Sequence, residues 1–173
     1  FVAATQPAKF AAMESLFDTR AGAPLLIGGW PDPARREVRY GLEIPGALSF
    51  LATNDFDATV AGLDRVPRGD WPNVRVTHVA FQVMVGCGAL MVLAAVLGWR
   101  ALAQRDDLAG HRHLLRLLVV AAPAGFLATE AGWVVTEVGR QPWVIQGVLR
   151  TADAVTPMPG LIVPFLGFTA LYV

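Results

Sequence analysis

The stretch that decides the fold is VTHVAFQVMVGCGALMVLAAVLGW, residues 76–99. It contains no Asp, Glu, Lys or Arg. An α-helix needs about 20 consecutive apolar residues to cross the hydrocarbon core of a bilayer, and this stretch supplies them. The sequence therefore predicts a transmembrane helix at residues 76–99.

A second apolar stretch at residues 114–138 predicts another transmembrane helix. Arg116 lies near one end of it and Glu130 near the other. Proline has no backbone N–H and clashes with the preceding helical turn. Pro123, beside Gly125, therefore predicts a kink in this helix.

The composition fits a membrane protein, with 54% hydrophobic and 16% charged residues. Soluble domains average about 45–50% apolar and about 25% charged. The zero net charge argues against a nucleic-acid partner, and the single cysteine, Cys87, excludes an internal disulfide.

Both chain ends fall in apolar runs, and residues 160–173 begin a third span. We expect an internal piece of a longer all-α integral membrane protein, a transmembrane helix bundle with a long extracytoplasmic loop.

The connection at residues 100–113 sets the expected orientation in the membrane. Short loops rich in Lys and Arg lie on the cytoplasmic side. Residues 1–75 and 139–159 are then both extracytoplasmic and can lie next to each other. The arginines that set this orientation are Arg100, Arg105, Arg112 and Arg116, against only two acidic residues, Asp106 and Asp107.

The long loop, residues 1–75, lacks a strong hydrophobic period. Pro at the first turn followed by helix-forming residues predicts a helix at residues 7–19. The many Gly and Pro residues of 20–45 predict mostly irregular structure there. Such a segment is more often a functional loop than a packed domain.

Polar residues within the spans are candidates for function, because an ionisable group at membrane depth is costly. Glu130 and Glu137 are two helical turns apart and share a face with Trp133. This pattern is typical of a proton-conducting or metal-ligating stripe. The alternative is that Glu137 is solvated at the interface and Glu130 is paired with an arginine.

Met84 lies in the middle of the first span and could be an axial haem ligand through its thioether. Gly86 and Gly88 would let a flat macrocycle approach the backbone. The alternative is an ordinary packing or lipid-facing methionine. His78 does not share a helical face with Met84, and we expect an interfacial histidine there.

The segment GRQPW, residues 139–143, follows Glu137 at the outer membrane boundary. The planar guanidinium of Arg140 could pair with a carboxylate or with haem propionates. Trp143 is suited to the membrane interface. An ordinary snorkelling arginine and an anchoring tryptophan explain the same pattern.

Together these segments resemble subunit I of bacterial cytochrome bd ubiquinol oxidase, over its second half. Three ordered blocks carry the resemblance. They are QPAKFAAME (6–14); EIP (43–45) with LSFLAT (48–53), VAGL (60–63) and MVG (84–86); and EAGW (130–133) through Glu137 to GRQPW and LRTADAV (149–155).

The resemblance implies roles for individual residues. Lys9 and Glu14 match the loop residues implicated in quinol binding and oxidation. Met84 matches an axial ligand of the low-spin haem b. Glu137 matches the carboxylate ligand in the high-spin haem pair, where oxygen is reduced.

Further residues would support the haem sites. Trp133 matches an aromatic residue among the haems, and Glu130 matches a position suited to proton supply. Arg140 matches a haem-site arginine, and Gln141 and Trp143 belong to the same block. Many family members have Arg two residues before the methionine ligand. Here that residue is Gln82, so a propionate contact there would lose its charge.

The resemblance implies a multi-pass protein of the bacterial inner membrane that oxidises quinol outside, releases protons there and reduces O2 to water. Its cofactors would be haem b and haem d, and its partners subunit II and small single-span subunits. The remaining histidine ligands lie in the family's first half, so this piece alone should be inactive. Ubiquinol versus menaquinol, and haem d versus haem b alone, stay open. The alternative is a non-catalytic membrane subunit or an ion-coupled transporter that uses Glu130 and Glu137.

Overall fold

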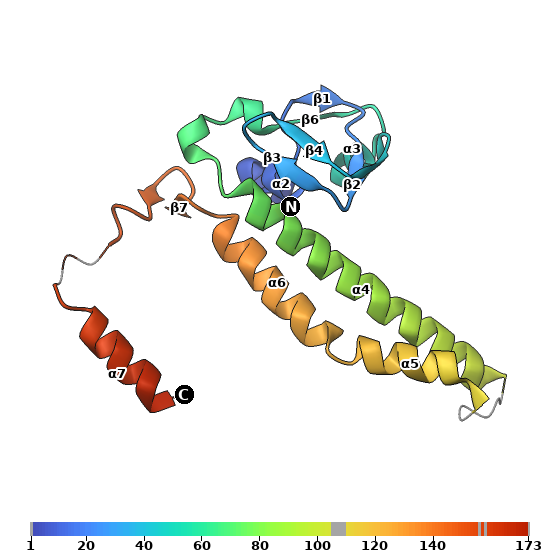
Figure 1. Ribbon diagram of the computed structural model, residues 1–173. Helices are drawn as coiled ribbons and strands as arrows, with labels where there is room; N and C mark the ends of the chain where they lie inside the picture. Colours follow the sequence, from blue (N-terminus) through green and yellow to red (C-terminus); the bar gives the residue numbers. More distant parts are fainter. Residues whose placement is uncertain (1, 105–109, 156, 158, 173) are drawn as a thin grey trace.

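The computed structural model describes residues 2–104, 110–155, 157 and 159–172. Figure 1 shows a compact N-terminal unit over one end of a pair of long antiparallel helices. The elements of the N-terminal unit are α1 (Val2–Thr5), α2 (Pro7–Met13), β1 (Arg20–Ala21), β2 (Leu25–Ile27), β3 (Trp30–Asp32), β4 (Glu37–Arg39), β5 (Leu42–Ile44), α3 (Ala47–Thr53), β6 (Thr59–Val60), η1 (Leu63–Arg65) and η2 (Arg68–Asp70).

The helix predicted at residues 76–99 is α4 (Val74–Ala103), which is longer than predicted at both ends. It begins at Asn73, whose side-chain oxygen accepts a hydrogen bond from the backbone N–H of Val76 at 3.2 Å. Such a cap satisfies a donor that has no partner within the helix. Because α4 runs to Ala103, the connection to the next helix is shorter than the predicted loop 100–113. Part of that loop, including Arg105, lies outside the described residues.

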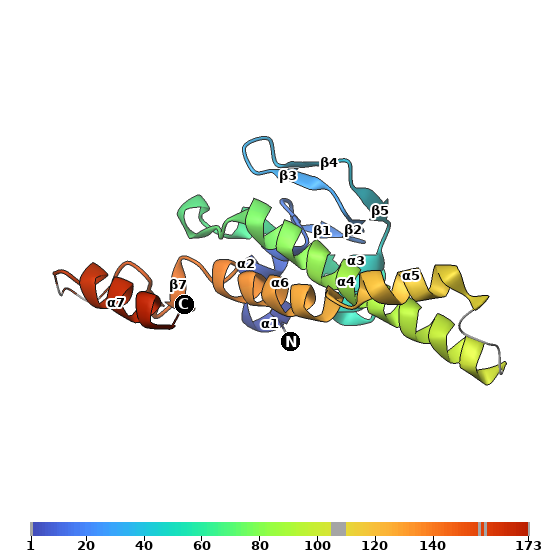
Figure 2. The same cartoon turned by 60° about the horizontal axis from the view of Figure 1, so that its bottom comes forward.

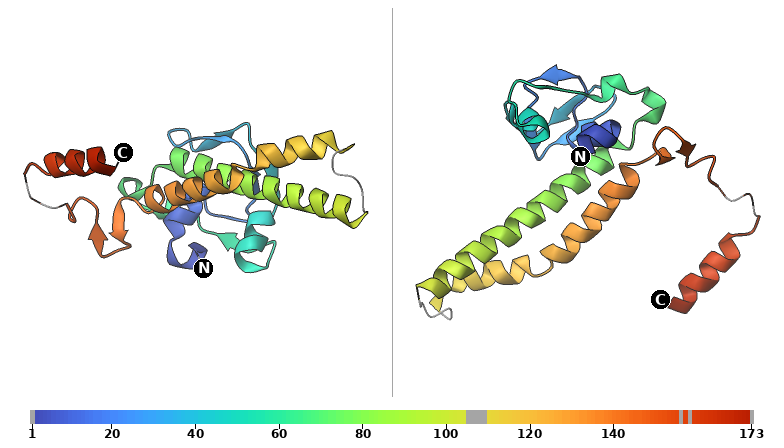
Figure 3. Two further views of the ribbon diagram at one scale, coloured as in Figure 1. Left: turned by 90° about the horizontal axis from the view of Figure 1, so that it is seen from below. Right: turned by 180° about the vertical axis from the view of Figure 1, so that it is seen from behind.

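The second predicted span is divided into α5 (Arg112–Ala121) and α6 (Ala124–Val138). The break falls at Pro123, so the predicted kink is confirmed, and its cause is the missing N–H of proline. By length and composition alone, α4 and the stretch Arg112–Val138 could each cross a membrane. Figure 3 shows α4 and α6 side by side from two further directions.

The prediction of an all-α protein is not confirmed, because the described residues contain four two-stranded antiparallel sheets. The prediction that residues 20–45 are mostly irregular was wrong. In that tract β2 pairs with β5 and β3 pairs with β4. Residues with positive φ lie in the connections between these strands, so the Gly-rich composition marks turns between short strands. They are Gly28, Gly29, Arg36 and Tyr40.

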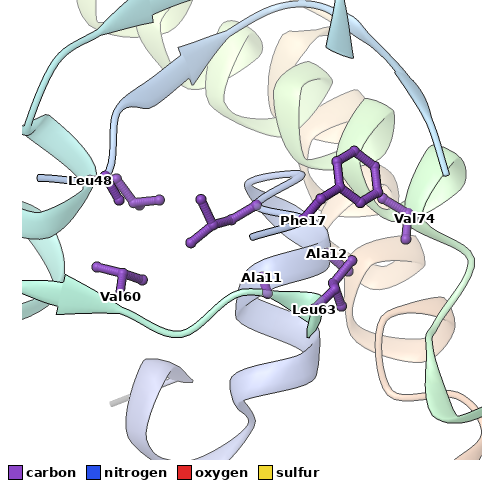
Figure 4. Close-up of a cluster of buried hydrophobic side chains, with 9 residues drawn as sticks. Ala11, Ala12, Phe17, Leu48, Val60, Leu63 and Val74 are labelled. Atoms are coloured by element: carbon purple, nitrogen blue, oxygen red, sulfur yellow. The ribbon is translucent and has the colours of Figure 1, made fainter. Parts of the chain in front are cut away.

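The N-terminal unit has its own apolar core, so it is better packed than the predicted loop (Figure 4). The core joins α2 to α3, to η1 and to the first turn of α4. Helix α2 ends at Met13, earlier than the predicted residue 19, because the chain turns there to bury the residues that follow. The core residues are Ala11, Ala12, Leu16, Phe17, Ala23, Leu48, Val60, Leu63 and Val74.

After α6 the chain forms a hairpin of β7 (Trp143–Ile145) and β8 (Leu149–Arg150) and then α7 (Ile162–Tyr172). Figure 2 shows α7 apart from the pair α4 and α6. The helix α7 is apolar but, at 11 residues, too short to cross a bilayer as it stands. A membrane span beginning at residue 160 stays a prediction.

Candidate functional site

The end of α2 presents Glu14 to the interior of the N-terminal unit. The N–H of Leu16 donates to the carbonyl of Ala11 at 2.8 Å, and the N–H of Ser15 donates to that of Ala12 at 3.3 Å. This pair of bonds is the Schellman arrangement, which requires a left-handed residue after the helix. Ser15 takes that conformation with φ at 51°. The turn therefore fixes the position of Glu14 at the helix end.

The carboxyl group of Glu14 is buried, with the residue only 5% exposed. Its Oε2 atom has no hydrogen-bond partner among the described residues. Burial disfavours the charged form and raises the pKa of Glu14 from 4.5 to about 7. A carboxyl with such a pKa can both accept and release a proton near neutral pH.

Glu14 lines a cavity of about 260 Å³ between the end of α2, β2 and β4. Leu26 and Val38 form apolar parts of its wall. Its charged parts are Asp18, Arg20, Arg36, Glu37 and Glu43. The side chains of Arg20 and Glu43 lie 3.7 Å apart and are about half exposed, so this charge pair lies at the rim. The cavity thus combines a buried proton acceptor with a mainly polar and charged lining in which Leu26 and Val38 supply apolar parts.

Lys9 does not line this cavity. A Cβ atom added to Gly139 would lie 3.2 Å from Cγ of Lys9, so the half-buried lysine packs against the end of α6. Burial is the main cause that lowers the pKa of Lys9, and the guanidinium of Arg140 lowers it further, while Glu137 opposes both. The structure therefore separates the two predicted quinol residues and brings Lys9 to the Glu137–Arg140 region.

Glu137 and Arg140 form an ion pair with 2.5 Å between Oε2 and Nη2. Both side chains are between a third and a half exposed in the described chain. Such partly exposed pairs contribute little to stability unless further groups cover them. The predicted carboxylate–arginine pairing is present, and its partners come from adjacent turns at the end of α6.

Met84 lies in the seam between α4 and α6. A Cβ atom on Gly132 would lie 3.1 Å from Sδ of Met84, and one on Gly125 would lie 3.6 Å from Sδ of Met91. In the same antiparallel register, a Cβ atom on Gly139 would lie 3.1 Å from Cγ2 of Thr77. Larger side chains spaced seven residues apart on α4 therefore pack against glycines spaced seven residues apart along α6 and its C-terminal end. The pairs are Met91 with Gly125, Met84 with Gly132 and Thr77 with Gly139.

The residues Glu130, Trp133 and Glu137 lie on another face of α6, and all three are exposed. Glu130 and Glu137 each stand two residues before a seam glycine, which is about 200° around the helix. The predicted stripe therefore faces away from α4, while Met84 faces α6. These side chains are exposed in the part of the chain that the structure describes.

His78 and Gln82 fasten the N-terminal unit to α4. The ring nitrogens of His78, which is fully buried, lie 2.8 Å from the carbonyl oxygen of Met13 and 3.1 Å from that of Gly28. One turn further along α4, the amide of Gln82 donates to the carbonyl of Leu26 at 2.9 Å and accepts from the N–H of Gly28 at 3.0 Å. We call these two residues the α4 clamp.

The side chain of His78, near the start of α4, is enclosed by the N-terminal unit. Its position at a membrane interface stays a prediction. Nothing in the local sequence reveals its two carbonyl partners. The spacing of four between His78 and Gln82 is the one available signal, since it places both side chains on one face of α4.

Gln141 and Trp143 belong to the hairpin after α6. The side-chain oxygen of Gln141 accepts from the hydroxyl of Thr151 at 2.6 Å. The guanidinium of Arg150 stacks 4.7 Å from the ring centre of Trp143 and also donates to Asp70 of η2 at 2.6 Å. The hairpin is thereby joined to the N-terminal unit.

Within the described residues, no group of three or more His, Cys, Asp or Glu side chains could hold a metal ion. Axial ligation of a haem needs only one side chain on each face of the iron, so this finding does not bear on Met84 or Glu137.

Comparison with known proteins places these features in one family. The family model described as cytochrome bd terminal oxidase subunit I matches residues 1–173. This chain belongs to that family. A solved bd oxidase from Geobacillus thermodenitrificans shares the fold with a TM-score of 0.81 and 39% identity, over 99% of this chain and 39% of that one.

Two relatives of this cytochrome bd subunit I chain come from Bacillus subtilis (strain 168). One, named as a cytochrome bd menaquinol oxidase subunit I, is 44% identical over 96% of this chain and 38% of its own length. The other, cytochrome bd ubiquinol oxidase subunit 1, is 35% identical over 88% and 35%. The chain therefore spans under two fifths of these relatives.

Gln82 stands where the family resemblance led us to expect Arg. Its amide oxygen and nitrogen are both engaged by the backbone of residues 26–28. In this chain the side chain serves the attachment of the N-terminal unit to α4.

Proposed function

We propose that this chain is the quinol-oxidising part of a bd-type respiratory terminal oxidase and supplies two of its haem ligands. The observation that carries the proposal is the buried carboxyl of Glu14, whose Oε2 atom has no partner among the described residues, beside a cavity that Leu26 and Val38 also line. The whole protein would be a multi-pass protein of the bacterial cell membrane. Its partners would be subunit II, small single-span subunits, quinol and O2.

Glu14 would accept a proton from quinol. Oxidation of a quinol to a quinone releases two protons and two electrons, so a base beside the hydroxyl assists the reaction. A carboxyl with a pKa of about 7 is ionised in a substantial fraction of molecules at neutral pH, and it can return the proton to solvent afterwards. The apolar parts of the wall formed by Leu26 and Val38 would hold the ring.

The charge distribution supports proton release outside the cell. The N-terminal unit lies at the start of α4, whereas Arg100, Arg112 and Arg116 lie near the opposite ends of the helices. Positively charged residues favour the cytoplasmic side. Glu14 is then extracytoplasmic, in agreement with the predicted position of residues 1–75, and so is the segment 139–159.

The residues at membrane depth fit haem in two places. Gly88, one turn along α4 from Met84, has no atom within 4 Å of an added Cβ, so a flat group could approach the backbone there, whereas the thioether itself packs against Gly132. Glu137 offers a carboxylate on the far side of α6. Met84 and Glu137 lie on different faces, and the family resemblance assigns the first to a low-spin haem b and the second to a high-spin haem.

Haem b and haem d, when bound, would hold the electrons of quinol and carry out the reduction of O2 to water. Trp133 would pack beside the high-spin site, and Glu130 would supply protons to it. Arg140 would balance the Glu137 carboxylate or a propionate. Lys9 would connect this region with the N-terminal unit.

Gln141 and Trp143 would support the same site indirectly, through the hairpin that they stabilise. For Gln82 we propose support of the cavity through residues 26–28, since its amide is already engaged there. This differs from a direct role at a haem propionate.

The test is steady-state oxidation of ubiquinol-1 by the intact oxidase carrying Glu14→Gln. Glutamine keeps the shape but cannot accept the proton, so kcat should fall about a hundredfold with the haem spectrum unchanged. Asp57→Asn, which removes an exposed charge of the same unit, is the matched control and should keep wild-type turnover. Wild-type turnover in Glu14→Gln would reject the proposed role.

A further inference from the structure

Ser15 adopts a backbone conformation that glycine adopts more easily. It is the left-handed residue of the turn that ends α2, with φ at 51°. Glycine is the usual residue at this place in a Schellman turn because a side chain is strained there. A turn needed only to end the helix would be more stable with glycine. Ending the helix therefore does not explain why this position carries a serine side chain.

The hydroxyl of Ser15 is also buried without a partner. The residue is 3% exposed, and its Oγ accepts and donates no hydrogen bond within the described residues. Buried polar atoms in native proteins nearly always have partners, so each exception needs an explanation. Three such side-chain atoms occur in the described chain, and those of Glu14 and Ser15 belong to consecutive residues.

Both residues line the same cavity. Their chemistry is complementary: an ionised Glu14 can only accept a hydrogen bond, whereas the Ser15 hydroxyl can donate one. A phenolic hydroxyl that contacted both side chains would satisfy both, since its hydrogen would point to Glu14 while its oxygen would accept from Ser15. The local strain and the two unpartnered atoms are then features of a single ligand site.

We propose that the Ser15 hydroxyl donates a hydrogen bond to the quinol oxygen whose proton Glu14 accepts. The inference rests on the proposed function of the Glu14 cavity. In the proton transfer, the quinol O–H bond breaks and an O–H bond forms on Glu14, while the Ser15 donor stays on the oxygen that becomes more negative. The same donor suits the quinone product, whose carbonyl oxygen can only accept.

The experiment compares Ser15→Gly and Ser15→Ala in the intact oxidase, with ubiquinol-1 as substrate. Both changes remove the hydroxyl, but glycine relieves the backbone strain and alanine keeps it. Loss of one neutral hydrogen bond should raise KM about fivefold in both variants. The melting temperature of Ser15→Gly should equal or exceed the wild-type value. The haem spectrum, recorded on the same samples, verifies assembly.

A wild-type KM in Ser15→Gly would overturn the inference, even if Ser15→Ala were impaired, because the effect would then come from the backbone. Ser15→Cys provides a near-isosteric variant with a weak donor, and its KM should also rise. Glu14→Gln is assayed in parallel. If Glu14→Gln oxidises quinol slowly but the Ser15 variants keep the wild-type KM, the role of Ser15 is rejected and that of Glu14 stands. If Glu14→Gln oxidises quinol at the wild-type rate, the proposed function is rejected as well.

Discussion

The Sδ atom of Met84 lies 3.1 Å from the position that a Cβ atom on Gly132 would occupy. The thioether thus depends on the absence of a side chain across the seam between α4 and α6. Gly125 and Gly139 make the corresponding contacts one heptad away on either side. The position of the proposed haem ligand is therefore set by a residue on another helix.

Gly132→Val should displace the Met84 thioether, because the valine side chain would occupy the space that it fills. We expect an altered low-spin haem b band in the reduced-minus-oxidised spectrum, with a destabilisation of about 1–3 kcal/mol from overpacking. Gly98→Val on α4, where no atom lies within 4 Å of an added Cβ, is the control and should leave the spectrum unchanged. A wild-type spectrum in Gly132→Val would contradict the proposed position of the ligand.

The rate of quinol oxidation should rise with pH as Glu14 loses its proton. Burial raises the pKa of Glu14 to about 7, so kcat/KM should increase through that pH and then level off. The measurement is a pH profile of the intact oxidase between pH 5 and 9. In Glu14→Gln the rise of kcat/KM near pH 7 should be absent. If the rise persisted in this variant, another group would be responsible for the titration.

The same titration affects stability. The raised pKa means that the folded protein binds more protons than the unfolded chain between pH 4.5 and about 7. The stabilising contribution is complete below pH 4.5 and is lost as the pH rises through about 7, with a total of about 3 kcal/mol for this buried group.

Thermal melting at several pH values tests this dependence. The melting temperature of Glu14→Gln relative to the wild type should increase from pH 5 to pH 8. Glu43→Gln, at the exposed rim of the cavity, should follow the wild type at every pH. A constant difference between Glu14→Gln and the wild type would show that the Glu14 pKa is the same in the folded and unfolded chains.

The α4 clamp should hold both walls of the cavity in place. His78→Leu would remove the ring that lies between the carbonyl oxygens of Met13 and Gly28. A neutral imidazole donates one hydrogen bond, so one carbonyl would lose its partner, at a cost of about 1–3 kcal/mol. We expect a higher KM for quinol and faster proteolysis of the N-terminal unit. Gln82→Leu should have a weaker effect of the same kind. Gln104→Leu, on the exposed end of α4, is the control. If His78→Leu resisted proteolysis as well as this control, the α4 clamp would be contradicted.

The sequence was sufficient to predict the two long helical stretches but not the structure of the N-terminal unit. The charge-free stretch around Met84 and the proline at residue 123 act locally, so α4 and the break between α5 and α6 could be predicted. The short strands of residues 20–45 could not, because each depends on a partner strand and on left-handed turn residues such as Arg36 and Tyr40.

The contacts of the candidate site likewise could not be predicted from the local sequence. Glu14 and Lys9 were found through the ordered blocks of the family, but their separation follows from the packing of α2 against Gly139. The partners of His78 are backbone carbonyls that lie 65 and 50 residues away in the chain. No periodicity or spacing encodes such contacts. Ser15 became a candidate only through its φ angle and its buried hydroxyl.

The most direct test of the central claim is rapid mixing of the oxidised intact enzyme with quinol while haem reduction is recorded. This measurement isolates electron entry from the later reaction with oxygen. In Glu14→Gln we predict that quinol reduces the haems about a hundredfold more slowly than in the wild type, whereas dithionite still reduces all of them. Haem reduction by quinol at the wild-type rate in that variant would contradict the account.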